Sequence, residues 1–302
     1  MNNLVALVWI CAGMVAFAAL VAAIPLRARG AWNRAHLAPN LALTAITFAT
    51  NALMNIALVV ALARAQSAGF GLLPVLALSP VWSGALAVAG FDLAWYATHV
   101  SMHHSALLWR FHRVHHCDPA VDVTTAIRQH PGESVVRYVY LAAFGLALGA
   151  SPAAFAVYRI VSALHGLFEH ANVGLPLALD RVLSWVVTSP NMHKVHHSRA
   201  PQWTNTNYGN IFSFFDRTFR TFTPARRGLA IDYGLDGFDD PALQTASGLL
   251  ALPFRAVQRS SSSSSSRVIA ASAAPSAESA SARLRACSAS TRSSTVSEAT
   301  SR

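Results

Sequence analysis

Long apolar runs divide this sequence and limit what it can fold into. The first run, Leu4 to Leu26, is about as long as a helix that crosses the roughly 30 Å hydrocarbon core of a bilayer. A second span is predicted from about Leu41 to Ala63, and a third, Val81–Ala97, follows Pro80. Only 12% of the residues are charged, about half the share in soluble domains. We therefore predict an all-α, multi-span membrane protein.

Two shorter apolar segments, 135–148 and 153–167, follow the third span and are joined by the residues GASP. Each is marginal for a full crossing. The pattern predicts a tight helical hairpin that enters the membrane and returns on the same side. That return would allow the polar segments before and after the hairpin to meet.

Positive charge predicts the orientation. Arg27, Arg29 and Arg34 follow the first run, whereas the leading residues MNN lack the basic charge of a cleaved signal peptide. By the positive-inside rule the N-terminus faces outward, and the Arg27–Arg34 loop is cytoplasmic with a solvated His36. The polar segment His99–Glu133 would lie on the same side. The predicted location is the inner (plasma) membrane.

The net charge of +10 does not indicate a nucleic-acid partner. Residues 255–302 hold seven Arg and two Glu, and no basic patch with interleaved aromatic residues occurs elsewhere. Seven consecutive serines, Ser260–Ser266, open a Ser/Ala/Arg-rich stretch that we predict to be disordered. The three cysteines show no framework spacing, so no structural disulfide is expected. Cys117 is either a metal ligand or a packing residue.

The histidines indicate metal binding, because twelve of the thirteen lie between residues 99 and 197. Residues three or four apart share a helix face. The pattern HxxHH occurs twice, in FHRVHHCDP and NMHKVHHSRA, and an i, i+4 pair precedes the first copy. Eight nitrogens are too many for one zinc ion, so two metal ions are expected. The predicted ligands of these groups are His99, His103, His112, His115, His116, His193, His196 and His197.

Four other residues are candidates for the same site. His165 and His170 end the hairpin and are predicted to complete the ligand shell, although residues five apart share one site only with bending. His130 is predicted to orient a ligand or substrate. Asp92 lies two turns before His99 and either accepts a hydrogen bond from a ligand imidazole or lies at the membrane interface. Imidazole suits iron, zinc, copper and nickel, so spacing does not choose the metal.

The order of these motifs resembles the fatty acid hydroxylase superfamily, also called the sterol desaturase family, of integral-membrane di-iron enzymes. The resemblance spans about residues 85–225 and rests on DLAWYATHVSMHH, LLWRFHRVHHCDP, TTAIRQHPGE, HGLFEHANVGLP, SPNMHKVHHS and NTNYGNIFSFFDRTFRTF. The closing motif of the family commonly reads W-D-x-x-F-G-T. Here Phe215 replaces the Trp and Arg220 the Gly, while Cys117 stands where Ser is common.

The resemblance implies two iron ions held by the histidines, with O2 as co-substrate. It implies hydroxylation or desaturation of a fatty acyl, sterol or related lipid that enters from the bilayer. It also implies an external electron donor, a reductase system of the ferredoxin or cytochrome type. Asn172 and Tyr208 would position ligands or substrate, although NTNYGN fits turn chemistry equally well.

Two other functions stay open. A zinc-dependent membrane hydrolase would need one open zinc site beside a Glu base, for which Glu169 is the candidate. A metal-binding or transport protein would carry its ligands in the middle of the spans, whereas here they lie at span ends.

The apolar pattern and the family resemblance together imply four regions. Residues 1–80 hold the N-terminal spans and loops, and residues 81–225, including the hairpin 135–167, form the di-iron catalytic domain. Residues 226–257 are a C-terminal extension, and residues 258–302 are the disordered tail.

Overall fold

The computed structural model describes residues 35–226 and 231–255, together with a few isolated positions before residue 27. All of them belong to one compact unit, residues 1–259, and a second unit begins at residue 260. Apart from those isolated positions, the first predicted span, the loop that follows it and the predicted disordered tail lie outside the described residues.

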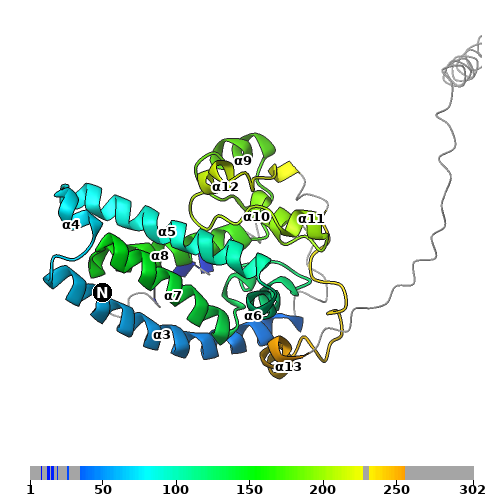
Figure 1. The fold of residues 1–302 in the computed structure, drawn as a ribbon. Coiled ribbons are helices and arrows are strands. Elements are labelled where there is room, and N and C mark those ends of the chain that lie inside the picture. The colour runs from blue at the N-terminus through cyan, green and yellow to red at the C-terminus, as the bar shows by residue number, and fades with distance from the viewer. Residues whose placement is uncertain are drawn as a thin grey trace, which may run out of the picture. The chain divides into compact units, whose positions relative to one another are not determined.

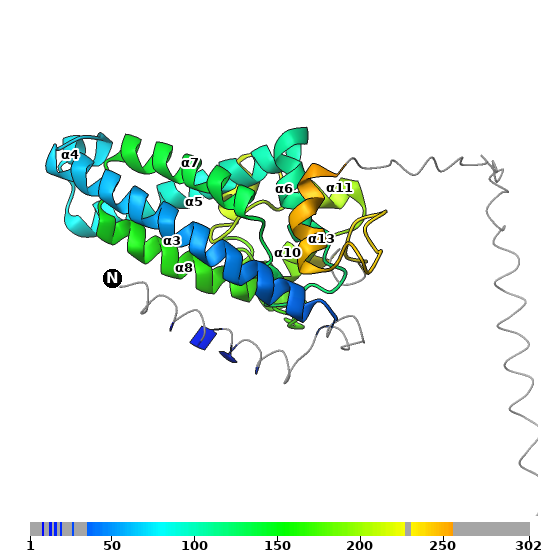
Figure 2. The same cartoon turned by 90° about the horizontal axis from the view of Figure 1, so that it is seen from below.

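Four long helices form the body of this unit: α3 (Leu37–Ser67), α5 (Pro80–His104), α7 (Pro131–Leu148) and α8 (Pro152–His170). They run side by side, with the short α4 (Leu72–Leu76) at one end (Figures 1 and 2). The described residues contain no β-strand beyond two isolated bridges, Val187–Phe212 and Ser198–Tyr233. The prediction of an all-α fold is confirmed.

Short helices gather toward the other end of the bundle (Figure 1). They are α6 (Ala106–His116), η1 (Thr125–Ile127), α9 (Leu177–Leu183), α10 (Pro190–His196), α11 (Pro201–Thr204), α12 (Phe214–Thr218), α13 (Ala246–Ala251) and η3 (Leu252–Phe254).

The starts of the main helices are encoded locally. In α5, α7, α8 and α10 a proline occupies the first turn, where its missing N–H costs no hydrogen bond. Ser151 and Ser189 precede two of these prolines and accept a hydrogen bond from a backbone N–H of the first turn. His130 does the same for α7 through its ring. These caps determine where α7, α8 and α10 begin.

The predicted hairpin is present as α7 and α8, and it is more open than expected. Gly149 ends α7 with a φ of 66°, a conformation that favours glycine. A Cβ on Gly149 would collide with the carbonyl oxygen of Phe70, so the turn lies directly against the chain between α3 and α4. Beyond the turn, α7 packs on α3 and α5, and α8 packs mainly on α5, rather than on each other.

One described stretch, Leu37–Leu76, is long and apolar enough to cross a membrane by length and composition. Only 17% of its most apolar window is buried within the protein. The exposed side chains along α3 include Leu41, Phe48, Leu53 and Ile56. This run matches the predicted second span. Further crossings by α5, α7 and α8, and the cytoplasmic cap, remain predictions.

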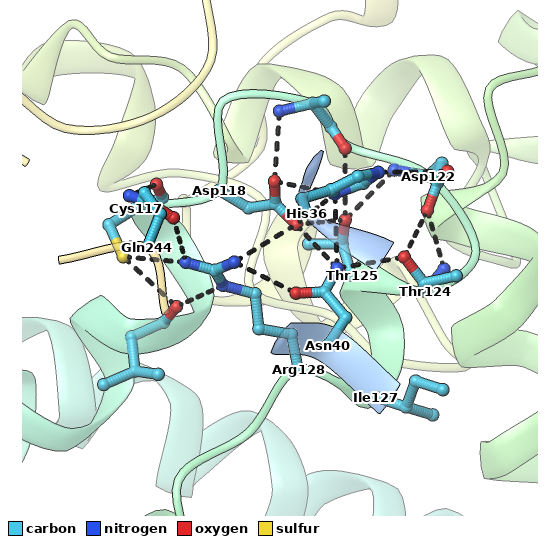
Figure 3. Close-up of polar contacts among 12 residues, drawn as sticks. His36, Asn40, Cys117, Asp118, Asp122, Thr124, Thr125, Ile127, Arg128 and Gln244 are labelled. Carbon is cyan, nitrogen blue, oxygen red and sulfur yellow. Dashed lines mark hydrogen bonds and ion pairs between the residues drawn. The ribbon is translucent and has the colours of Figure 1, made fainter. Parts of the chain in front are cut away.

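A buried polar network joins the start of α3 to the segment after α6 (Figure 3). Nδ1 of His36 lies 3.0 Å from both carboxylate oxygens of Asp118, and Asn40 donates to the same carboxylate. Arg128 donates to Asn40, to the Cys117 sulfur and to Gln244 of the C-terminal extension. The prediction of a solvated His36 is wrong, because the ring packs against these partners and the residue is only 2% exposed.

Candidate metal centre

The structure brings nine histidine rings together in two adjacent clusters at the end of the bundle. The first cluster contains His99, His103, His112, His116 and His196. The second contains His115, His170, His193 and His197. Within each cluster the candidate ligand nitrogens lie within 4.8 Å of one another. Nitrogens bound at about 2.1 Å to one ion are separated by roughly 3 to 4 Å, so both clusters are compact enough to surround an ion.

Each HxxHH motif contributes to both clusters. His112 and His116 enter the first cluster while His115 enters the second, and His193 and His197 enter the second while His196 enters the first. A helix advances about 100° per residue, so residues i and i+4 differ by about 40° while i+3 lies about 60° to the other side. The first and last histidines of each motif therefore point toward one cluster, and the middle histidine points toward the other.

The two clusters lie in contact. The ring of His116 is stacked on that of His197 with 4.7 Å between centroids, and these rings belong to different clusters. The distance suits two ions held side by side rather than two independent sites.

The hydrogen bonds of the rings direct lone pairs inward. Nδ1 of His99 lies 2.8 Å from the carbonyl oxygen of Tyr208, Nδ1 of His196 lies 2.8 Å from that of Thr206, and Nδ1 of His170 lies 2.7 Å from that of Gly166. A carbonyl only accepts, so each Nδ1 carries the proton and each Nε2 of these neutral rings carries a lone pair.

A cation explains this arrangement. Nε2 of His170 lies 3.2 Å from that of His115, 3.0 Å from that of His193 and 3.2 Å from that of His197. One lone pair cannot satisfy three such neighbours. The Nε2 atoms of His99 and His196 are buried without a hydrogen-bond partner, which is costly unless something binds them. The residues present therefore fit a metal ion in each cluster.

Burial keeps these imidazoles in the form that binds metals. Removal from water, reinforced by neighbouring rings, holds the pKa of His116, His196 and His197 well below its usual value. Burial likewise lowers the pKa of His115 to about 4. Because a metal ligand must be unprotonated, the rings are ready to bind at neutral pH.

Two glutamates lie behind the rings. An oxygen of Glu133 is 3.2 Å from Nδ1 of His112, and the two oxygens of Glu169 lie 3.6 and 3.7 Å from Nδ1 of His170 and His193. Carboxylates on the far nitrogen of a ligand fix ring orientation and raise ligand basicity. Sequence reasoning missed this role, because neither glutamate stands at a chelating spacing.

Three of the predicted site residues do not reach the clusters. Nε2 of His165 lies 2.8 Å from the carbonyl oxygen of Thr188, so this ring points away from the position expected for a ligand. His130 caps α7 and bonds the carbonyl of Leu250 in the C-terminal extension rather than a clustered histidine. Asp92 accepts hydrogen bonds from Asn210, Ile211 and Phe212 and so anchors the loop after Tyr208 instead of an imidazole.

The remaining predicted residues differ in their relation to the clusters. The ring of Tyr208 lies edge-on to His103 at 5.1 Å between centroids, and its hydroxyl meets His104. Asn172 is buried at the end of α8. The sulfur of Cys117 accepts from Arg128 and lies in neither cluster, which favours packing over metal binding. The other two cysteines lie outside the described residues.

A cavity of about 490 Å³ lies between α3, α7 and α8 and opens onto both clusters. Its walls include Phe48 of α3, Tyr138 of α7 and Phe155 of α8. At one end it reaches His99 of the first cluster and His193 of the second. The volume falls within the usual range of small-molecule sites. The open hairpin thus leaves room for an elongated apolar ligand beside the histidines.

Comparison with known families agrees with this geometry. Residues 84–221 match the family model described as fatty acid hydroxylase. This stretch is similar to the fatty acid hydroxylase family. The match starts within α5 and ends just after α12, so it includes both histidine clusters and the two helices of the hairpin.

Curated relatives are similar over the same part of the chain. An alkylglycerol monooxygenase of Danio rerio is 32% identical over 47% of this chain and 31% of its own length. An alkylglycerol monooxygenase of Xenopus tropicalis is 29% identical over 51% of this chain and 33% of its own length. Ornithine lipid hydroxylase OlsE of Rhizobium tropici is 31% identical over 50% of this chain and 44% of its own length. The chain thus spans less than half of each relative, and no solved structure matches it.

Proposed function

We propose that this chain is a membrane-bound, non-haem di-iron oxygenase that uses O2 to oxidise a C–H bond of a lipid. The observation that carries the proposal is the cavity, which extends between apolar helix faces and ends at both histidine clusters. The family match and the names of the relatives support the same class of reaction.

The first cluster would hold one iron through up to five imidazoles and the second would hold the other through four. Imidazole-rich sites suit iron, and bound iron would supply the activation of O2 and the removal of hydrogen from carbon. Glu133 and Glu169 would keep the ligand rings oriented from behind. The apolar cavity walls would hold an alkyl chain beside the metals and exclude water from it.

The location and the partners belong to the same proposal. The apolar exposed surface of α3 supports a membrane setting. The arginines that follow the first apolar run favour a histidine end on the cytoplasmic side and an N-terminus outside. Electrons would come from a separate reductase system of the ferredoxin or cytochrome type. A lipid would enter the cavity from the bilayer.

The zinc hydrolase alternative receives less support. Glu169 would have to face the metal as a general base, whereas its carboxylate lies beside the Nδ1 atoms of His170 and His193. The lone pairs that could bind metal are on the opposite side of those rings. A transport role is also less supported, because the clusters lie at helix ends and not along the spans.

Metal analysis and lipid analysis together test the proposal. We expect two irons per purified chain and lipid-dependent O2 consumption with a suitable reductant. Membrane lipids from cells with and without the protein would be compared by mass spectrometry. A gain of one oxygen atom indicates hydroxylation, and a loss of two hydrogen atoms indicates desaturation. His196→Ala should abolish the product, and one zinc per chain without O2 consumption would refute the proposal.

A further inference from the structure

Within the part of the chain that the structure describes, one positive charge in the cavity wall has no counter-charge. Arg159 of α8 lines the cavity and is partly buried. Among residues 35–226 and 231–255 it forms no ion pair and no hydrogen bond. Its guanidinium carbon lies 5.6 Å from the centroid of the Tyr138 ring, which also lines the cavity. The group therefore points inward, toward α7.

The neighbouring arginine is bound differently. Arg137 of α7 is buried, donates to Gln129 at 2.5 Å, lies 3.8 Å from Glu133 and stacks over Trp95 at 4.5 Å. Its charge is thus satisfied within the protein. Glu133 and Glu169, the two carboxylates in the cavity wall, also face ligand histidines. Neither of them is paired with Arg159.

An uncompensated guanidinium beside apolar walls is unfavourable unless a ligand supplies the opposite charge. Arginine binds carboxylate and phosphate groups through paired, charge-assisted hydrogen bonds. Along α8, Arg159 and His170 are eleven residues apart, which corresponds to roughly 16 Å of helix. An alkyl chain covers such a length with on the order of a dozen carbon–carbon bonds of about 1.5 Å.

We propose that Arg159 binds the anionic end, a carboxylate or a phosphate, of an alkyl lipid whose chain extends along the cavity to the histidine clusters. This inference rests on the proposed function and adds the substrate class. It places the oxidised carbon far along the chain from the acidic end, because Arg159 lies about three turns of α8 away from the ligand His170.

Binding without turnover tests the inference. The metal-loaded full chain would be placed in bilayers of neutral phosphatidylcholine at pH 8, without reductant. The probes would be radiolabelled hexadecanoate, hexadecyl phosphate and hexadecan-1-ol. We expect the wild-type protein to bind at least one anionic probe about 10- to 100-fold more tightly than the alcohol, the range for a hydrogen bond to a charged group. The two anions distinguish a fatty-acid from a phospholipid source.

Matched variants identify the residue responsible. Arg159→Gln should bind the anionic probe no more tightly than the alcohol and should leave the affinity for the alcohol within about two-fold. Arg159→Lys keeps the charge without the paired geometry and should retain part of the preference. Arg64→Gln removes an exposed arginine of α3 and should leave the preference unchanged.

The outcomes separate this inference from the proposed function. If Arg159→Gln keeps the preference for the anion, or loses affinity for the acid and the alcohol equally, the inference is overturned. No preference in the wild type would overturn it as well. If Arg159→Gln fails to retain metal, the anion preference of the wild type is compared with that of Arg159→Lys instead, and an equal preference in the two proteins overturns the inference. Selective binding without any oxidised product would instead contradict the proposed oxygenase activity.

Discussion

Nε2 of His170 lies 3.0 Å from Nε2 of His193, although the two residues belong to different helices. His170 ends α8, the returning helix of the hairpin, and His193 lies on α10, which carries the second HxxHH motif. Because Nδ1–H of His170 donates a hydrogen bond to the carbonyl oxygen of Gly166, the nitrogen that faces His193, Nε2, carries a lone pair. The contact is explained by an ion between the two rings.

His193→Ala should remove a ligand of the second cluster and leave the first cluster intact. We expect the iron content to fall from about two ions per chain to about one, with loss of the oxidised lipid. His165→Ala is the matched control, because that ring bonds Thr188 outside both clusters. Elemental analysis of the two purified variants is the measurement. Equal losses of metal in both would mean that His165 also binds metal.

Glu133→Gln should weaken metal binding without removing a ligand. The substitution keeps the shape of the side chain but removes the charge 3.2 Å from Nδ1 of His112. Loss of such an outer carboxylate typically costs 10- to 100-fold in metal affinity, so we expect a loss of about that size. Competition with a chelator gives the affinities. An unchanged value would show that Glu133 serves only to bind Arg137.

Arg220→Gly should stabilise the protein. Arg220 follows α12 with a φ of 63°, the left-handed region in which glycine is favoured, and its side chain is exposed. The family commonly has glycine at this position. Arginine in its place strains the backbone, because a residue with a Cβ rarely adopts this φ. We expect a gain of about 1 kcal/mol in the free energy of unfolding. The measurement is the thermal melting of Arg220→Gly and of Arg220→Ala. Only the glycine variant should have a higher melting midpoint than the wild type.

Stability should fall at alkaline pH because of His36. Burial alone would lower its pKa, but the hydrogen bonds with Asp118 and the nearby carboxylate of Asp122, 3.5 Å from Nε2, outweigh burial and raise the pKa to about 9. The charged pair with Asp118 therefore contributes its full stability below about pH 6.5, the usual pKa of histidine, and loses it as the pH rises through about 9. We expect a decline in melting temperature over this interval.

His36→Gln is the control for that decline. Glutamine retains hydrogen-bonding capacity but cannot gain a proton, so the variant should be less stable at pH 6 and approach the wild type near pH 10. Melting curves of both proteins at several pH values give the comparison. A constant difference between them across the range would show that His36 acts by packing and not by charge.

Local pattern was sufficient for much of the candidate site. Nine of the ten histidines predicted as ligands lie in the two clusters, because i, i+3 and i+4 spacing determines which side chains share a helix end. The return of the hairpin was also predictable from two short apolar segments joined by a turn. The prediction for His165 was wrong because residues five apart point in directions about 140° apart around a helix. The ring of His170 faces the second cluster, whereas that of His165 contacts the backbone carbonyl of Thr188.

Other features depend on contacts between distant segments. The sequence alone determined the helices, their caps and the two sets of closely spaced histidines, since these follow from neighbours along the chain. Tertiary structure decided which ring enters which cluster, where Glu133 and Glu169 lie, and that His36 is buried against Asp118. It also decided that α7 and α8 separate around a cavity. Helix packing brings together residues far apart in the sequence, and no local spacing encodes that arrangement.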